Sequence, residues 1–409
     1  MVNYIKNNSC RLCDSSKIKN VFNLKATALA NAFRKNISII NKKYPLNVYL
    51  CLDCKHLQLV NIINPKILFS NYLYSSGASK VYIRHLENYS KDVIKIYGLD
   101  KSKDLICDIA SNDGTFLKFF RDKGFTVLGI EPAKNLAKIA NKNNIKTKNN
   151  FFDNNFINLN KKLIKKFKII TANHVFAHLK YINNFVLAVN KLLRDDGIFI
   201  FEVGYLIDIL EKKYFDTIYH EHLDYHHANP LVNFLVNLGF SIVDINNVKI
   251  QGGSLRILCK KDYNKKISKK SYLFLKKEKN TIIYKKKFIQ SWERKIKDTM
   301  KDAREKIMKT TYNESIFGYG SPTKIILFLK LLKLPPNKIR YIFEDNKLKQ
   351  NKYLPIFGNK IICTSKIKKF KPKYLLIFAW NFKNDIKKKV YKVDKKIKLL
   401  VPLPKFKVI

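Results

Sequence analysis

Residues 105–131 read LICDIASNDGTFLKFFRDKGFTVLGIE, and this stretch decides the fold. An apolar run at 105–109 leads into a loop of small and polar residues. Helical spacing follows over 116–125, and a second apolar run lies at 126–130. A strand, a short loop, a helix and a strand in this order predict a parallel, doubly wound α/β sheet. Two further apolar runs are separated by helical segments, so we expect more strands at 169–172 and 198–201.

Other parts of the chain predict additional elements. A second α/β unit opens at 315–320, SIFGYG, and its later strands are expected at 341–343 and 374–378. Helical spacing is present over 76–98. Residues 253–259 predict an antiparallel edge strand, and the lysine-rich residues 266–310 predict a solvated connecting helix. The chain has 409 residues, so two or three domains are expected.

The loop at 108–115 predicts a nucleoside-binding site. Its small residues let a ligand approach the backbone closely, and Glu131 ends the next strand, where a carboxylate can accept hydrogen bonds from a ribose diol. The loop lacks the Gly-x-Gly-x-x-Gly pattern of dinucleotide-binding proteins, which disfavours NAD as the ligand.

Two Cys-x-x-Cys pairs predict a metal site near the N-terminus. Two such turns can bring four thiolates into the tetrahedron that Zn²⁺ prefers, and two pairs argue against a redox role. His56 is an alternative ligand that a complete set of four cysteines makes unnecessary. A closed site of this kind stabilises the fold and leaves no open position for chemistry. The expected ligands are Cys10, Cys13, Cys51 and Cys54.

Residues 214–227, YFDTIYHEHLDYHH, contain half of the eight histidines in the chain, together with tyrosine and carboxylate side chains. Imidazole, phenol and carboxylate groups transfer protons near neutral pH, so this density indicates a catalytic or ligand-binding segment. The alternative is a buried polar turn without a chemical role.

The order of these motifs resembles that of the SAM-dependent C-methyltransferases that act on nucleotide-linked ketosugars. The resemblance spans almost the whole chain. It rests on the two cysteine pairs with HLQL at 56–59, SNDGTFL at 111–117, GIEP at 129–132, NHVFAH at 173–178, YHEH at 219–222, GGSLR at 252–256, GYGSPTK at 318–324 and FAWN at 378–381.

This resemblance implies an architecture and two cofactors. The expected fold class is α/β, with an N-terminal zinc-binding domain at 1–75, a central Rossmann-like SAM methyltransferase domain at 76–262, a helical connector at 263–310 and a C-terminal Rossmann-like α/β domain at 311–409. The cofactors are S-adenosyl-L-methionine (SAM) and a structural Zn²⁺ ion, and the partner is a nucleotide-linked sugar.

The resemblance also implies the residues that bind SAM. The loop after the first strand would wrap the methionine part, Glu131 would bind the ribose, and adenine contacts are expected after the third strand. Ala110 stands where Gly is common. The implied residues are Asp108, Ser111, Asn112, Asp113, Gly114, Glu131, Phe152, Asp153 and Asn173.

For catalysis, methyl transfer to carbon requires removal of a proton beside a ketone. His222 is the expected base, with Glu221 supporting it, and the resulting enolate would attack the SAM methyl group. Tyr219 and Tyr74 would stabilise the oxyanion, and His178 completes the set. We interpret His220 and the pair at 226–227 as structural.

Three residues are expected to contact the substrate: Arg256, Tyr319 and Lys324. The glycines at 318–320 lie between a strand and a helix, where a diphosphate can bind, and Lys324 would add positive charge. A tight turn without a ligand is the alternative.

The formal net charge of +49 raises the question of nucleic-acid binding. Arginines number nine among the 80 basic residues, and the lysines are spread along the whole chain, which disfavours a nucleic-acid groove. The sequence shows no apolar run of membrane-spanning length and no signal-peptide pattern, so we expect a cytoplasmic enzyme without membrane insertion. The alternatives are methylation at O or N of another small molecule or of RNA, and a zinc-containing nucleic-acid-binding protein.

Overall fold

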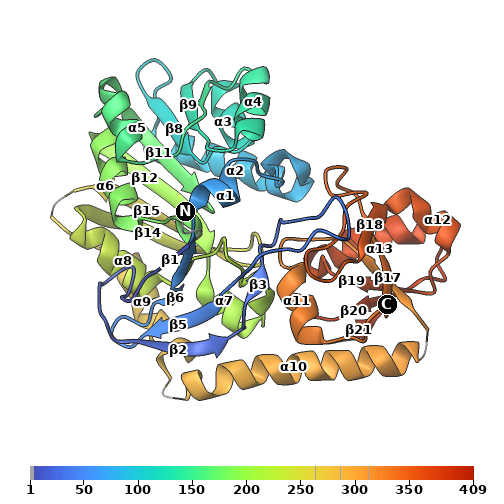
Figure 1. Ribbon diagram of the computed structural model, residues 1–409. Coiled ribbons are helices and arrows are strands. Elements are labelled where there is room, and N and C mark those ends of the chain that lie inside the picture. Colours follow the sequence, from blue (N-terminus) through green and yellow to red (C-terminus); the bar gives the residue numbers. More distant parts are fainter. Residues whose placement is uncertain (1–3, 263, 286, 313) are drawn as a thin grey trace. The chain divides into compact units, whose positions relative to one another are not determined.

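The computed structural model describes residues 4–262, 264–285, 287–312 and 314–409 (Figure 1). The chain forms two compact units. Unit 1 comprises Met1–Lys19, Tyr49–Asp208 and Glu221–Lys285, and unit 2 comprises Asn20–Val48, Ile209–His220 and Lys286–Ile409. The predicted domain limits at residues 1 and 263 lie outside the described residues.

A mixed sheet forms the centre of unit 1, in the strand order β10-β9-β8-β11-β12-β15-β14. The first five strands are parallel, which confirms the predicted doubly wound α/β class, and β15 alone runs antiparallel to both of its neighbours, β12 and β14. Their bounds are β8 (Leu105–Ile109), β9 (Thr126–Ile130), β10 (Thr147–Lys148), β11 (Phe167–Asn173), β12 (Leu193–Gly204), β14 (Phe240–Val248) and β15 (Ser254–Lys261).

The prediction for residues 253–259 was right about direction and wrong about position. β15 pairs on both sides, with β12 and with β14, so β14 is the edge strand. The signal for β14 is weak because only its first half is mostly buried, and the second half alternates with polar residues.

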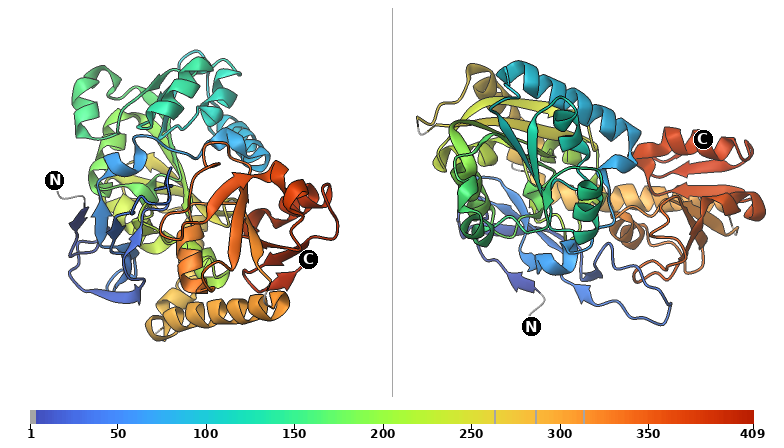
Figure 2. Two further views of the ribbon diagram at one scale, coloured as in Figure 1. Left: turned by 45° about the vertical axis from the view of Figure 1, so that its right-hand side comes forward. Right: turned by 90° about the horizontal axis from the view of Figure 1, so that it is seen from above.

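Both faces of this sheet are covered by apolar side chains. In β12, Ile198 and Ile200 belong to a core formed with α2 (Lys80–Tyr97) and α3 (Thr115–Arg121). The alternate residues Phe199 and Phe201 contact Phe176 instead. This two-residue period is what a strand buried on both faces requires. Figure 2 shows α2 lying along one face of the sheet.

The local sequence explains where α2 and α3 end. Ser79 caps α2 by accepting a hydrogen bond from the backbone N–H of Tyr82, and Gly98 ends the helix in the left-handed conformation, with φ of 53°. α3 ends at Arg121, four residues earlier than its helical spacing predicts, because the chain turns back at Gly124, where φ is 89°.

Smaller sheets surround the cysteine pairs. One has the order β13-β6-β5-β2, and another pairs β1 with β7. In the first, Asp224 of β13 lies opposite Gln58 of β6, so the end of the histidine-rich run is a strand beside the second cysteine pair. The bounds are β1 (Tyr4–Lys6), β2 (Ile18–Asn23), β5 (Asn47–Cys51), β6 (Leu57–Leu59), β7 (Asn61–Ile63) and β13 (Asp224–Tyr225).

The remaining helices before the second sheet connect these strands. They are α1 (Pro65–Phe69), α4 (Lys134–Lys142), α5 (Asn154–Leu159), α6 (Ile182–Leu192), α7 (Leu206–Glu211), α8 (Ala228–Asn237) and α9 (Lys269–Glu278). Short 3₁₀ helices are η1 (Ser76–Ala78), η2 (Lys161–Leu163), η3 (Phe176–His178), η4 (Phe215–Thr217) and η5 (Ile282–Tyr284).

Unit 2 is built on a second sheet, in the order β18-β17-β16-β19-β20-β21, which confirms the predicted C-terminal α/β unit. Its strands are parallel except for β21. The strands are β16 (Ile316–Tyr319), β17 (Ile339–Glu344), β18 (Lys360–Cys363), β19 (Tyr374–Ile377), β20 (Lys398–Val401) and β21 (Lys407–Val408), and a separate pair joins β3 (Thr27–Ala28) to β4 (Lys43–Tyr44). The helices are α10 (Phe288–Thr311), α11 (Ile325–Leu332), α12 (Ile367–Phe370) and α13 (Lys383–Tyr391), with η6 (Thr364–Lys366) and η7 (Trp380–Phe382).

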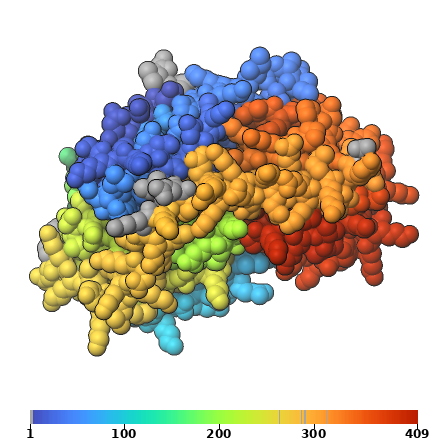
Figure 3. All heavy atoms as spheres, turned by 90° about the horizontal axis from the view of Figure 1, so that it is seen from below, coloured from blue at the N-terminus to red at the C-terminus, as the bar shows by residue number. Residues whose placement is uncertain are grey.

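The predicted solvated connector is two helices, α9 and α10, and the second of them is not fully solvated. α10 buries one apolar side, which includes Trp292, Ile296, Met300 and Ile307. Trp292 contacts Phe22 edge to face, with ring centroids 5.6 Å apart. Figure 3 shows α10 as part of an orange band at the surface. The prediction of a fully solvated helix was wrong because it gave more weight to the many lysines than to the regularly spaced apolar residues among them.

Among the described residues, no helix combines the length and the apolar character that crossing a membrane requires.

Candidate active site

The two cysteine pairs come together in unit 1. The sulfur atoms of Cys10, Cys13, Cys51 and Cys54 all lie within 4.8 Å of one another, and two of the separations, Cys10–Cys54 and Cys13–Cys51, are 3.6 Å. Thiolates bound tetrahedrally to Zn²⁺ at about 2.3 Å lie roughly 3.8 Å apart. The four cysteines therefore fit a zinc ion, as the sequence predicted.

The two cysteine turns have the same backbone conformation. The residue after each second cysteine, Asp14 or Lys55, has a positive φ and donates its N–H to the carbonyl of the first cysteine. Among the described residues the group that could hold the metal consists of the four cysteines, and His56 Nε2 instead lies 2.9 Å from an oxygen of Asp224.

The loop after β8 has the strained backbone of a ligand-binding turn. Ala110 and Asn112 have φ of 54° and 56°, a region that favours glycine, which accounts for the preference for Gly at position 110. Between them, the Ser111 hydroxyl is buried, and the structure gives it no hydrogen-bond partner among the described residues. Gly129 makes room for it, because a Cβ there would lie 2.5 Å from Ser111 Oγ.

Glu131 lies at the end of β9 and holds this loop. Its two carboxylate oxygens accept hydrogen bonds from the backbone N–H groups of Asn112 and Ala133, each at 2.8 Å. Burial raises the pKa of Glu131 to about 7. In β8, Asp108 accepts a hydrogen bond from Thr171 Oγ1 at 2.6 Å, and burial also raises its pKa to about 7. Both carboxyl groups can therefore change charge near neutral pH.

Asn173 ends the neighbouring parallel strand, β11. Both polar atoms of its side chain are buried without a hydrogen-bond partner among the described residues, and so is Nε2 of His174. Burial lowers the pKa of His174, which keeps the ring neutral. Buried polar groups normally have partners, and ligands of such folds bind at the carboxyl ends of the strands. Ser111, Asn173 and His174 thus offer the unpaired groups that the amino acid part and ribose of SAM can satisfy.

The structure places the two predicted adenine contacts beside α5. Asp153 caps that helix by accepting a hydrogen bond from the Phe156 N–H at 2.9 Å. The Phe152 ring packs against Phe156 and Phe185, with centroids 5.7 and 5.2 Å away. Both residues therefore have structural contacts, and their contact with adenine stays a prediction.

Three of the predicted catalytic residues meet in unit 1. His178 Nδ1 donates to the backbone carbonyl of Glu221 at 2.6 Å, which leaves Nε2 as the proton-accepting nitrogen. The rings of His178 and His222 are 5.0 Å apart between centroids. Burial lowers the pKa of His178 to about 4, so this ring is neutral at physiological pH.

The segment 72–77 connects this cluster to the loop after β8. At one end, the Tyr72 hydroxyl donates to Glu221 Oε2 at 3.0 Å. At the other, the Tyr74 carbonyl accepts from Asn112 Nδ2 at 3.2 Å, and Gly77 N donates to Asp113 at 2.8 Å. Sequence reasoning missed Tyr72, although its spacing of two residues from Tyr74 is a usable signal.

Tyr74 itself is 42% exposed, and its hydroxyl accepts a hydrogen bond from Gln251 Nε2 at 3.0 Å. Partial burial raises the pKa of Tyr74, so the phenol keeps its proton at neutral pH and can act as a donor.

Arg256 has a partner within the protein. It lies 2.6 Å from the buried carboxylate of Glu202, which also lies 2.9 Å from His85 Nε2, and its guanidinium stacks 3.7 Å from the centre of the Tyr89 ring. Neither Glu202 nor His85 was predicted to belong to a site. The predicted contact of Arg256 with substrate stays a prediction.

The other predicted residues belong to unit 2. Tyr219 lies just before the boundary between the units, which falls after His220. Lys324 Nζ lies 2.9 Å from Asp216 and 3.9 Å from the Trp380 ring centre, and Tyr319 donates to a carboxylate oxygen of Asp345 at 3.2 Å. Lys324 is therefore already paired within its own unit.

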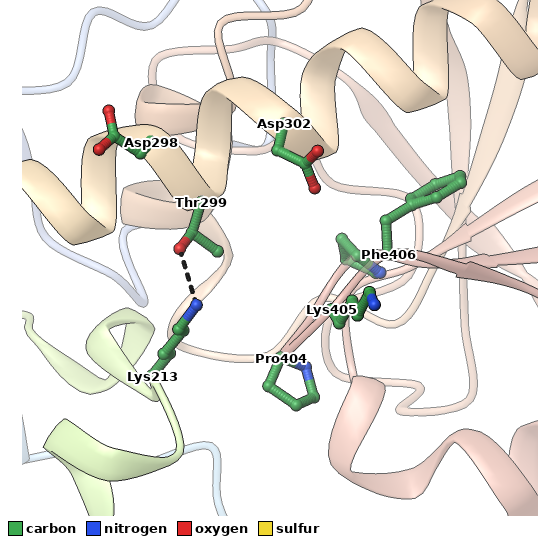
Figure 4. Close-up of a pocket in the computed structure, with 8 residues that line it drawn as sticks. Lys213, Asp298, Thr299, Asp302, Pro404, Lys405 and Phe406 are labelled. Atoms are coloured by element: carbon green, nitrogen blue, oxygen red, sulfur yellow. Dashed lines mark hydrogen bonds between the residues drawn. The ribbon is translucent and has the colours of Figure 1, made fainter.

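Unit 2 also has a pocket of about 350 Å³ beside α10 (Figure 4). The predicted site residues do not line it. Lys213 reaches across to Thr299 at 3.4 Å, and the rest of the lining is Asp298, Asp302, Pro402, Pro404, Lys405 and Phe406. The lining residues carry charges of both signs, and none of them is a predicted catalytic residue.

Comparisons with known proteins match almost the whole length of the chain. Family models match a zinc binding domain at residues 10–69, a methyltransferase domain at 82–245 and a C-methyltransferase C-terminal domain at 249–404. The C-methyltransferase NovU of Streptomyces niveus is 26% identical over 409 residues, which cover 98% of this chain and 96% of that protein.

Two shorter matches cover less than half of the chain. An uncharacterized methyltransferase of Alkaliphilus oremlandii is 27% identical over 156 residues, which cover 35% of this chain and 70% of that protein. A solved S-adenosylmethionine-dependent methyltransferase of Clostridium acetobutylicum covers 44% of this chain and 92% of its own, with 14% identity and a TM-score of 0.37. The family models follow one another in the predicted order, so the predicted architecture is confirmed.

Proposed function

We propose that this chain, which matches a zinc binding domain, a methyltransferase domain and a C-methyltransferase C-terminal domain in order, methylates a carbon atom beside the ketone of a nucleotide-linked keto-deoxysugar. One observation carries the proposal. The segment 72–77 bonds to the loop at 111–114 and to Glu221, so the predicted SAM loop and the predicted proton-transfer groups share one support.

The chemistry begins with removal of the proton beside the ketone. We assign His222 as the base, because a second imidazole, His178, packs beside it and burial keeps that ring neutral. A neutral neighbour adds no positive charge that would repel a protonated His222. The Glu221 carboxylate, fixed by Tyr72, stabilises the imidazolium that forms.

The enolate that results carries its charge on oxygen. Tyr74 keeps its proton at neutral pH and is the assigned donor to this oxygen; Tyr219, two residues before Glu221 in the chain, remains a predicted second donor. When bound, SAM supplies a methyl group whose bond to sulfur breaks as the new carbon–carbon bond forms, with the electron pair left on sulfur. Ser111, Glu131 and Asn173 are the groups that would hold it.

A panel assay tests the proposal. The protein is incubated with SAM and nucleotide-linked ketosugars, and mass spectrometry measures the gain of one methyl group. Without SAM, exchange of the proton beside the ketone with D₂O tests enolisation separately. Methyl transfer to oxygen or nitrogen, without such exchange, would refute the proposal.

The base assignment has its own variant. His222→Asn should lose both D₂O exchange and methyl transfer, with SAM affinity unchanged. The matched control is His227→Asn, because His227 belongs to the same histidine-rich run in unit 1 but pairs with the Tyr284 hydroxyl at 3.1 Å. Full exchange in His222→Asn contradicts the assignment.

A further inference from the structure

We propose that Arg11, which lies between the first two zinc ligands, is a positioning residue for the catalytic histidines. The catalytic role of the histidines rests on the proposed function. The positioning role of Arg11 rests only on the contacts that the structure shows. Arg11 is the second residue of the first Cys-x-x-Cys turn, so the metal site fixes its backbone on both sides.

The Arg11 side chain points away from the metal and into the protein. It is 4% exposed, and its Nε lies 2.9 and 3.0 Å from the two carboxylate oxygens of Asp224, which is fully buried. Asp224 follows His222 by two residues. A planar guanidinium that faces a carboxylate in this way restricts both the distance and the orientation of the two groups.

The same guanidinium also holds the other catalytic segment. Its Nη2 donates to the carbonyl of Leu179, and Nη1 donates to the carbonyl of Lys180 at 3.3 Å. These are the two residues that follow His178. One arginine therefore joins the zinc turn to the chain just after each of the two histidines whose rings are in contact.

Neighbouring contacts extend this connection. The backbone N–H of Arg11 donates to the Gln58 side chain at 2.8 Å, and His56 Nε2 lies 2.9 Å from Asp224. Leu223 N donates to the carbonyl of Ala177 at 2.6 Å, which links the two histidine segments directly. The residues just outside the metal site thus fix the spacing between His178 and His222.

The second cysteine turn shows that the metal site does not itself require an arginine here. Leu52 occupies the position equivalent to Arg11, between Cys51 and Cys54, and its side chain is 39% exposed. The two turns share a backbone conformation, yet only the first carries a side chain that reaches the catalytic segments. Arg11 therefore serves a purpose beyond the binding of zinc.

The test compares Arg11→Met with the matched control Leu52→Ala. Both variants should bind one zinc ion and bind SAM within about twofold of the parent protein. In Arg11→Met, amide hydrogen exchange at 177–180 and 221–224 should accelerate by about tenfold or more, whereas exchange in β8–β12 stays unchanged. Misplacement of reacting groups by about 1 Å lowers rates by roughly 100-fold, so kcat should fall by that order with little change in KM for SAM.

A milder variant covers the case in which Arg11→Met fails to fold. Arg11→Lys keeps the charge beside Asp224, but one ammonium group cannot also reach both carbonyls. Faster exchange should then be confined to 177–180, and kcat should remain reduced.

Each outcome decides the question. Unchanged exchange at both histidine segments in a folded variant overturns the proposal, and so does loss of zinc in Arg11→Met but not in Leu52→Ala. If exchange accelerates as expected but the parent protein methylates no nucleotide-linked ketosugar, the structural role stands and the proposed function fails.

Discussion

Replacing Arg256 by methionine separates two roles for this residue, a contact with substrate and a partner for Glu202. The structure supports the second role directly. Arg256 Nε and Nη2 lie 2.8 and 2.6 Å from one oxygen of a carboxylate that has no exposed surface. The guanidinium also stacks 3.7 Å from the Tyr89 ring centre.

The expected loss of stability follows from these contacts. Removing one member of a buried ion pair costs about 3–5 kcal/mol, and a buried cation–π contact contributes roughly 1–2 kcal/mol. His85 remains 2.9 Å from Glu202 and offsets part of this loss. We therefore expect Arg256→Met to lower the free energy of unfolding by about 3 kcal/mol at pH 8.

The pH dependence has a definite sign. Burial by itself would raise the pKa of Glu202, but the hydrogen bond with His85 and the charge of Arg256 outweigh it and lower the pKa. The stability that this carboxylate contributes is therefore present above the ordinary glutamate pKa of about 4.3 and is lost as the pH falls through the lower, folded-state value. Without Arg256 that pKa rises, so the variant should lose less stability at pH 5 than at pH 8.

Urea unfolding at pH 5 and pH 8 measures the change in the free energy of unfolding. A separate kinetic assay measures KM for the methyl acceptor. The control is Arg121→Met, because Arg121 pairs with Asp122 at the surface and this pair should contribute under about 1 kcal/mol. If Arg256→Met changes stability by less than about 1 kcal/mol while KM for the acceptor rises tenfold or more, Arg256 is a substrate contact and the reasoning from Glu202 is refuted.

Three further predictions concern other parts of the chain. Gly129→Ala should weaken SAM binding about tenfold, measured by calorimetry, because the new methyl group would displace Ser111. The KM for the methyl acceptor should not change. Unaltered SAM affinity would show that the Ser111 hydroxyl is not needed for SAM binding. Removal of zinc by a chelator should lower Tm and accelerate amide exchange first around Cys10 and Cys51, and equal exchange with and without zinc would contradict a structural metal. Lys324→Met should lower unfolding stability by about 3 kcal/mol by leaving Asp216 buried without a cation; an unchanged Tm with a raised acceptor KM would favour the diphosphate contact.

Local patterns in the sequence were sufficient for the fold class and the metal ligands. The strand, loop and helix at 105–121 and the two cysteine turns depend on residues close together in the chain, and both predictions are confirmed by the sheet order and by the sulfur positions. The edge strand β14 and the buried side of α10 were missed because their apolar residues are diluted by polar ones.

The supporting contacts of the candidate site could not be predicted, because they join residues far apart in the chain. Tyr72 and Glu221 are separated by 149 positions, and Arg11 and Asp224 by 213. No periodic pattern relates such residues, since their proximity depends on how the sheets are stacked and connected. The resemblance indicated the candidate catalytic groups, whereas the structure shows which residues hold them in place.

The histidine-rich run is held by a buried carboxylate near each end, and one of these carboxylates gives a structural role to two C-terminal motifs of the resemblance. Asp216 lies 2.9 Å from Lys324 and accepts a hydrogen bond from Trp380 Nε1 at 2.8 Å, all within unit 2. Asp224 is held by Arg11 and His56 within unit 1. A buried carboxylate is tolerated only with such partners. The contacts of Asp216 and of Asp224 therefore fix the chain on either side of residues 219–222. The motifs at 318–324 and 378–381 thus have a structural reason to accompany the predicted catalytic segment at 219–222, which lies roughly 100 and 160 residues earlier, respectively.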